Sequence, residues 1–262
     1  LDTHRPLVKQ IRRLVETVQP KGLQRLRKQS DGDDFDLDAL VEAYKELKRG
    51  SLPDLNIDQR LKRQQRDLAV LLLLDLSEST NESVDDHGIT VIEIAKEATT
   101  LLASAIEQIG DPFAIHGFSS NGRHDVQYQC LKSFEQLFDD DVKAKLAGVR
   151  GKLSTRIGAA MRHAGHYLNQ QHQSKKLLLL LSDGEPSDID VRDPEYLKSD
   201  THKAVDELLC QGITPYCLTI DKDAGTYISS LFGHGRYTIL NDVTRLPSLL
   251  PQLFASLTKM TN

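Results

Sequence analysis

From residue 67 onward, short apolar runs alternate with longer amphipathic stretches. Residues 68–74 and 177–181 are apolar at every position, as in strands that are buried on both faces. Between the runs, apolar residues recur at the three-to-four-residue spacing of helices. We expect strands near 68–75, 113–118, 125–130, 176–182, 213–220 and 236–240. We expect helices near 89–109, 139–147, 156–172, 200–211, 223–232 and 244–259.

This alternation predicts an α/β fold with a central, mostly parallel sheet and helices on both faces. The strand near 125–130 is the exception, because it is short and alternates polar with apolar residues. It follows Ser119-Ser-Asn-Gly122, a connection suited to a tight turn and too short for a crossover helix. We therefore expect one antiparallel edge strand in this Rossmann-like sheet.

The first 66 residues have a different texture, since they are rich in charge and carry no strand-like apolar run. Apolar residues at helical spacing predict two amphipathic helices, near 7–18 and 37–47. The five aspartates between 31 and 38 are expected to form a solvated helix start, in which acidic side chains favour the helix dipole. We therefore expect an N-terminal helical extension over 1–66 and one larger domain over 67–262.

Composition narrows the function classes. The chain has 262 residues and a formal charge of −5, which disfavours nucleic-acid binding because such binders usually carry a basic excess. No apolar run approaches the roughly 18 residues that a membrane span needs. Three cysteines without metal-site or disulfide spacing favour a reducing, cytoplasmic location. The chain starts at Leu1 rather than methionine, so we expect a piece of a longer protein.

Candidate chemistry gathers where predicted strands end. Asp75, Ser77 and Ser79 follow the first buried strand, Asp183 follows another, and Thr155 precedes a helix. In an open α/β sheet, ligands bind outside the carboxyl ends of the strands. Five oxygen donors without histidine or cysteine suit Mg²⁺. We expect these five side chains to hold Mg²⁺, whose remaining charge would favour a carboxylate from outside.

Charged residues near this predicted site leave alternatives open. Lys152 and Arg156 flank Thr155 and either steer an acidic partner or are ordinary solvated charge. His163 and His166 lie three apart on one predicted helix, but no third zinc ligand accompanies them. Three acidic residues follow Asp183 closely: Glu185, Asp188 and Asp190. We expect them to be solvated loop charge, with metal ligation or a docking rim as the alternative.

The segments Asp75-Leu-Ser-Glu-Ser79, Thr155 and Asp183-Gly184 together resemble the metal-ion-dependent adhesion site of von Willebrand factor type A domains. Ser182 stands where many such domains have threonine. Longer blocks, including Ser154-Thr-Arg-Ile-Gly-Ala-Ala-Met-Arg-His163 and Ser182-Asp-Gly-Glu-Pro-Ser-Asp188, resemble the C-terminal region of the CbbO/NorD family. That likeness extends over nearly the whole chain.

The resemblance implies a non-catalytic adaptor of a MoxR-type AAA+ ATPase hexamer, which docks an acidic site of a client protein through Mg²⁺. CbbO-type members serve rubisco activation and NorD-type members serve nitric oxide reductase maturation; we favour rubisco as the client. A metal-chelatase subunit and an extracellular adhesion module are alternatives. A Mg²⁺-dependent hydrolase is disfavoured, because no histidine or lysine base is implied beside Ser77 or Ser79.

Overall fold

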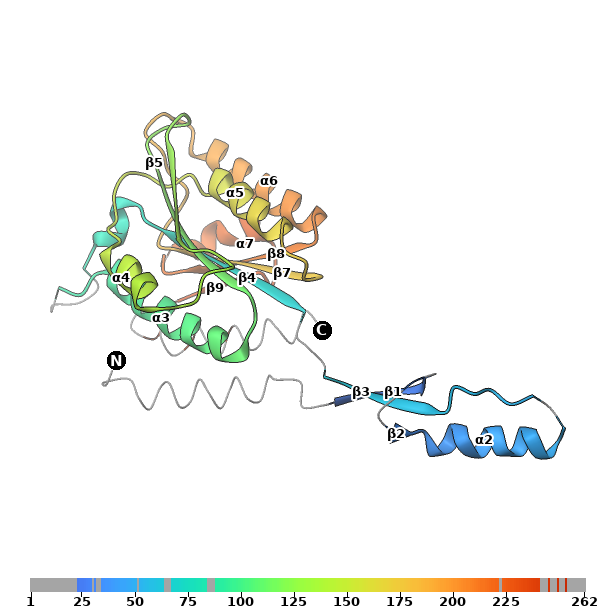
Figure 1. Cartoon of the computed structure of the whole chain (residues 1–262). Helices are drawn as coiled ribbons and strands as arrows, with labels where there is room; N and C mark the ends of the chain where they lie inside the picture. Colours follow the sequence, from blue (N-terminus) through green and yellow to red (C-terminus); the bar gives the residue numbers. More distant parts are fainter. Residues whose placement is uncertain are drawn as a thin grey trace. The chain divides into compact units, whose positions relative to one another are not determined.

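The structure is a computed structural model. It describes residues 23–29, 31, 34–50, 52–63, 67–83, 88–221, 223–240, 245, 249 and 253. The described residues form two compact units, one within residues 19–66 and one from Asp67 onward (Figure 1). The helix predicted near 7–18 lies outside the described residues, and the helix predicted near 244–259 falls largely outside them.

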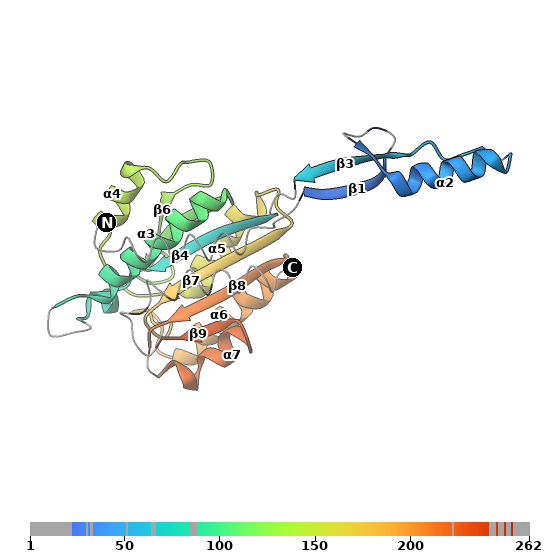
Figure 2. The same cartoon turned by 90° about the horizontal axis from the view of Figure 1, so that it is seen from below.

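The larger unit is built on a six-stranded sheet with the order β6-β5-β4-β7-β8-β9 (Figure 2). Its strands are β4 (Leu68–Asp75), β5 (Phe113–Ser120), β6 (Val126–Lys132), β7 (Lys175–Ser182), β8 (Ile213–Thr219) and β9 (Tyr237–Ile239). All neighbours pair in parallel except β5 and β6, which pair antiparallel at one edge. The predicted parallel sheet with one antiparallel edge strand is confirmed.

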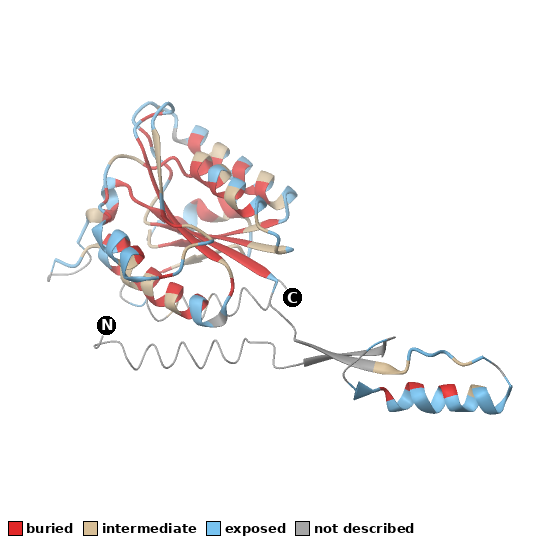
Figure 3. Ribbon diagram, viewed as in Figure 1, coloured by how far each residue is buried: buried red, intermediate tan, exposed pale blue. Residues whose placement is uncertain are grey.

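Two helical layers cover the sheet. One face packs on α3 (Val91–Ile109) and α4 (Asp140–Gly148). The other face packs on α5 (Ile157–Asn169), α6 (Pro194–Cys210) and α7 (Ile228–Phe232). Within β4, residues alternate between the two cores, and every residue of the strand is buried (Figure 3). The continuous apolar runs arise because both faces of the central strands are covered.

Helix α6 starts at Pro194, six residues before the predicted start near 200. Asp193 caps it by accepting a hydrogen bond from the backbone N–H of Glu195, and proline at the first helical turn is compatible with the helix. Among the described residues, no helix is both long enough and apolar enough to cross a membrane.

The smaller unit contains strands that the sequence did not predict. Here β1 (Leu23–Gln29), β2 (Asp34–Phe35) and β3 (Asp58–Arg63) form an antiparallel sheet with the order β1-β3-β2, beside α2 (Leu37–Lys48). The predicted helix near 37–47 is present, but the expectation of a purely helical extension is wrong. Charged and amide residues make up most of β1 and β3, so their sequences lack an apolar strand signal. Backbone pairing between distant segments forms the sheet instead.

Candidate metal site

The candidate site begins at the carboxyl end of β4. Asp75 is the last residue of the strand, and its Oδ1 accepts a hydrogen bond from the backbone N–H of Ser77 at 3.0 Å. The hydroxyls of Ser77 and Ser79 are 3.1 Å apart. Leu76 points instead into the apolar core and is buried. The alternation of the motif thus gathers one carboxylate and two hydroxyls.

Two hydroxyls from other parts of the chain reach the same carboxylate. Thr155 donates to Asp75 Oδ2 at 2.8 Å, and Ser182 donates to the same oxygen at 2.9 Å. The sequence predicts Thr155 as a site residue, whereas it does not predict Ser182 as one. Its position directly before Asp183, at the end of the strand next to β4, was the available signal.

Asp183 supplies the second carboxylate. Its Oδ1 is buried and has no hydrogen-bond partner among the described residues. Burial, and then the nearby charge of Asp75, raise the pKa of Asp183 to about 6, while the Ser79 hydroxyl opposes this rise. All five predicted site residues therefore lie in one cluster.

The cluster fits a hard divalent cation. Burial also raises the pKa of Asp75, although three hydroxyls and a backbone N–H bond to or approach its carboxylate. Asp75 is buried and Asp183 is half-buried with one buried, unpartnered oxygen, and the raised pKa of each shows that its ionised form is unfavourable here. A bound cation would stabilise both ionised carboxylates. The surrounding donors are hydroxyls, which are hard ligands suited to Mg²⁺.

Residues 151–155 are held against the β4 motif by backbone contacts. Lys152 N–H donates to the carbonyl of Leu76 at 2.8 Å, and Glu78 N–H donates to the carbonyl of Leu153 at 2.9 Å. Leu153 has a φ of 68°, a left-handed conformation that non-glycine residues rarely adopt. Such unfavourable backbone is found mainly where the surrounding structure fixes it, often at functional sites.

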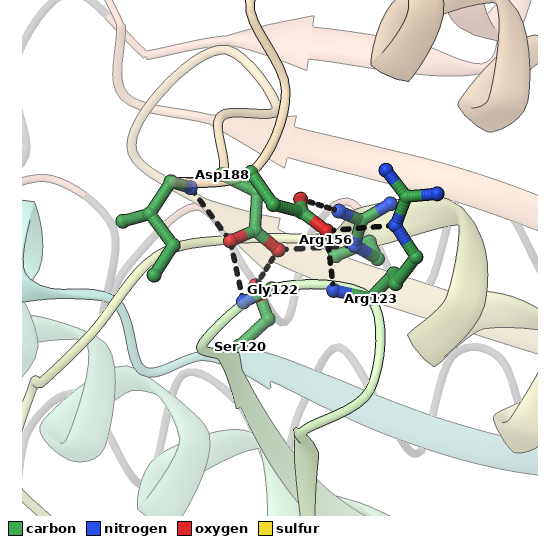
Figure 4. Close-up of polar contacts among 7 residues, drawn as sticks. Ser120, Gly122, Arg123, Arg156 and Asp188 are labelled. Atoms are coloured by element: carbon green, nitrogen blue, oxygen red, sulfur yellow. Dashed lines mark hydrogen bonds and ion pairs between the residues drawn. The ribbon is translucent and has the colours of Figure 1, made fainter.

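The loop after Asp183 corrects one expectation. Asp188 is not solvated, because its side chain is fully buried and forms an ion pair with Arg156 Nε at 3.0 Å. Asp190 pairs with both Arg156 and Arg123, two arginines that Figure 4 labels beside Asp188. Glu185 is exposed and forms an ion pair with Lys198 at 3.3 Å.

Arg156 is likewise neither solvated nor directed at a partner. Its side chain is only 8% exposed, and both neighbouring aspartates neutralise it. The sequence missed this pairing because 32 residues separate Arg156 from Asp188. Lys152 is exposed, so its proposed steering role stays a prediction.

The two helical histidines have other neighbours. The His163 ring lies edge-on to Tyr128 at 4.4 Å between centroids, and His166 Nε2 lies 3.0 Å from the amide of Gln170. In the part of the chain that the structure describes, no group of three or more histidine, cysteine or acidic side chains is placed to hold a metal ion. A metal at the candidate site would thus depend on hydroxyl ligands as well as the two aspartates.

Solved structures share this fold at low sequence identity. The PilB minor pilin from Streptococcus sanguinis matches with a TM-score of 0.60 and 14% identity, over 76% of this chain and 62% of the pilin. The von Willebrand factor type A structure from Catenulispora acidiphila matches with a TM-score of 0.51 and 15% identity, over 75% of this chain and 43% of the other. These likenesses concern the fold alone.

Proteins related by sequence have a higher identity to this chain than these solved structures have. An uncharacterised protein of Pseudomonas aeruginosa is 42% identical over 238 residues, which is 90% of this chain and 38% of that protein. Protein NorD of Brucella melitensis is 37% identical over 251 residues, 96% of this chain and 39% of that protein. Protein NorD of Stutzerimonas stutzeri is 37% identical over 237 residues, with 90% and 38% covered. The chain therefore spans about two fifths of the length of these relatives.

The family model of the von Willebrand factor type A domain matches residues 69–252, which include all of the six-stranded sheet except Leu68 and every residue of the candidate site. The chain belongs to the von Willebrand factor type A domain family.

Proposed function

We propose that this chain is a Mg²⁺-dependent docking module that binds a carboxylate of a partner protein. The single observation that carries the proposal is the pair of raised-pKa aspartates, Asp75 and Asp183, with a buried oxygen of Asp183 unpartnered. Bound Mg²⁺ would supply a positive charge that accepts a carboxylate oxygen from the partner. The domain family, whose fold is widely used for protein interaction, supports this function.

The residues of this chain divide the work. Ser77, Ser79 and Thr155 would offer neutral oxygens, which leave the charge of the ion less neutralised than carboxylates would. Asp75 is fixed by its hydrogen bonds and orients these hydroxyls. Asp183 would add the second negative charge of the site. The ion and the two carboxylates would then sum to zero formal charge, and a carboxylate of an acidic partner would bind at an open coordination position of the ion itself.

For the partner, the relatives named NorD favour a NorD-type adaptor over a CbbO-type one. By resemblance, such an adaptor works with a MoxR-type AAA+ ATPase hexamer, and its client is nitric oxide reductase. ATP hydrolysis would occur in the ATPase, and this chain would be non-catalytic. The expectation of rubisco as client stays a prediction, without support from the relatives.

A pull-down from a lysate of the source organism tests the proposal. The full chain serves as bait with Mg²⁺ or with EDTA, and mass spectrometry identifies the proteins that differ. We expect a Mg²⁺-dependent client that the Asp75→Ala bait and the double Ser77→Ala, Ser79→Ala bait no longer recover. A bait with Ser199→Ala, an exposed serine on α6, is the control.

The client identified then decides between adaptor types. Nitric oxide reductase subunits would support the NorD-type assignment, and rubisco or chelatase subunits would keep the metal mechanism but change the client. Metal-dependent docking would be contradicted if the wild-type bait recovered the same amount of client with EDTA as with Mg²⁺, and if the Asp75→Ala bait recovered as much as the wild type.

A further inference from the structure

The carboxylate of Asp188 joins three segments that surround the candidate metal site. Its Oδ2 accepts from the Ser120 hydroxyl at 2.8 Å and from Arg156 Nε at 3.0 Å. Its Oδ1 accepts from the backbone N–H of Gly122 at 2.8 Å and of Ile189 at 2.7 Å. Figure 4 shows these bonds converging on one side chain from the β5–β6 turn, the start of α5 and the loop after β7.

The same three segments pair through their backbones on either side of Thr155. Ser154 and Ser120 exchange two backbone hydrogen bonds, both at 2.8 Å. Thr155 and Ser187 exchange two more, at 2.9 and 3.0 Å. Thr155 therefore sits in a short ladder between the end of β5 and the loop after β7, and Arg156 and Asp188 each directly follow a member of its second rung.

A buried ion pair is a weak source of stability, because removing two charges from water costs about as much as their attraction returns. Such pairs can instead fix one arrangement among several similar ones. Here the arginine side chain contacts two aspartates with different nitrogens, Nε to Asp188 and Nη2 to Asp190. This two-point contact fixes the side chain of the residue next to Thr155.

We propose that Arg156 and Asp188 are positioning residues of the metal site, whose ion pair holds Thr155 so that its hydroxyl meets Asp75. This inference rests on the proposed function and deepens it. Among the residues that the structure describes, neither side chain of the pair hydrogen-bonds to any of the five site residues, so the pair acts through the backbone of Thr155 and Ser187. Loss of the ion pair should weaken the binding of Mg²⁺ more than that of Ca²⁺, because Mg²⁺ demands near-octahedral geometry, whereas Ca²⁺ accepts flexible coordination.

The test measures the affinity for Mg²⁺ and for Ca²⁺ by calorimetry, well below the melting temperature, on the full chain. Asp188→Asn should weaken Mg²⁺ binding about tenfold or more and Ca²⁺ binding less, so that the preference between the ions changes. Arg156→Lys retains the charge but cannot bridge both aspartates, and should give a smaller change in the same direction. It also keeps the test decisive if Asp188→Asn does not fold.

Arg162→Met is the matched control. Arg162 lies on the same helix and also bridges two acidic residues, Asp200 and Glu207, at 2.8 and 2.6 Å, but it joins no segment of the metal site. It should leave both metal affinities within about twofold of wild type, whatever it does to the melting temperature. If Arg156 had a purely structural role, Arg156→Lys would leave the affinities for Mg²⁺ and Ca²⁺ as unchanged as Arg162→Met does.

Asp75→Asn separates the two possible failures. If it abolishes Mg²⁺ binding while folded Asp188→Asn and Arg156→Lys bind both ions as wild type does, the positioning role is wrong and the metal site stands. If the wild-type chain itself binds no Mg²⁺, the proposed function and this inference are both wrong.

Discussion

Asp183 illustrates how a side chain can oppose stability and serve binding. Its pKa is raised from 3.8 to about 6, so near neutral pH the fold holds a carboxylate that would be more favourable in the unfolded chain. In EDTA, Asp183→Asn should therefore raise the free energy of unfolding at pH 7.5 by about 1–3 kcal/mol. Urea titration measures this change.

The same Asp183→Asn variant should lose stabilisation by Mg²⁺, because it removes a ligand charge. Asp125→Asn, at an exposed position in the β5–β6 turn, is the control and should change neither quantity. If the variant is less stable than wild type in EDTA, the Asp183 carboxylate has favourable partners in the folded protein. That result would contradict an Asp183 oxygen that is available to a metal ion.

His116 provides a pH dependence outside the metal site. It is buried on β5, its Nδ1 lies 2.7 Å from the hydroxyl of Tyr128, and burial and then His163 lower its pKa from 6.5 to about 4. Below pH 6.5 the unfolded chain binds a proton that the folded chain does not. The free energy of unfolding should thus fall between pH 6.5 and pH 4, by on the order of 3 kcal/mol in total.

Urea titrations of the wild type and of His116→Gln across this pH range isolate the effect, because the variant lacks the titrating ring while other groups are unchanged. We expect the wild type to lose more stability than the variant as the pH falls. Parallel pH curves for the two proteins would show that His116 does not contribute.

Among the connecting segments, the one from Gly151 to Arg156 depends on close packing. A Cβ on Gly151 would lie 2.4 Å from Thr80 Oγ1 and 2.6 Å from the carbonyl oxygen of Ser77. Gly151→Ala should therefore push this segment away from the β4 motif, lower the free energy of unfolding by about 1–3 kcal/mol and weaken Mg²⁺ binding.

Gly148→Ala is the control for this loop, since a Cβ there meets nothing within 4 Å and the residue ends α4. Thermal melting with and without Mg²⁺ checks both variants. Equal behaviour of the two alanine variants would show that the segment can move without affecting the site.

The accuracy of prediction differs between elements for physical reasons. Residues 68–74 of β4 and 177–181 of β7 are apolar at every position because helices cover both faces of the sheet, and the sequence therefore predicts this burial directly. Because β4 and β7 are parallel neighbours, Asp75 at the end of β4 and Asp183 directly after β7 lie at the same carboxyl end of the sheet. Strand β3 has no such signal, because its sequence, Asp-Gln-Arg-Leu-Lys-Arg, contains a single leucine.

Long-range polar pairing was the other feature that local sequence could not reveal. The burial of Arg156 depends on Asp188 and Asp190, more than thirty residues later, and charged residues in loops are usually exposed. The local pattern therefore predicts solvated charge at the two aspartates and leaves Arg156 open between solvated charge and steering of an acidic partner. Only the tertiary structure identifies the pair as buried.

For the molecule as a whole, metal binding and folding should be linked. An ion that binds only the folded chain adds about 2.7 kcal/mol to the free energy of unfolding at one hundred times its dissociation constant. Adding Mg²⁺ should raise the melting temperature, and EDTA should reverse the rise. The double Ser77→Ala, Ser79→Ala variant should fold but melt at the same temperature with or without Mg²⁺.

The most direct measurement is a calorimetric titration of Mg²⁺ into the wild-type chain and into Asp75→Asn, each first stripped with EDTA. One Mg²⁺ should bind per wild-type chain, and the variant, verified as folded by circular dichroism, should bind none. Absence of binding to the wild type, or equal binding to both proteins, would contradict a metal centre built on Asp75.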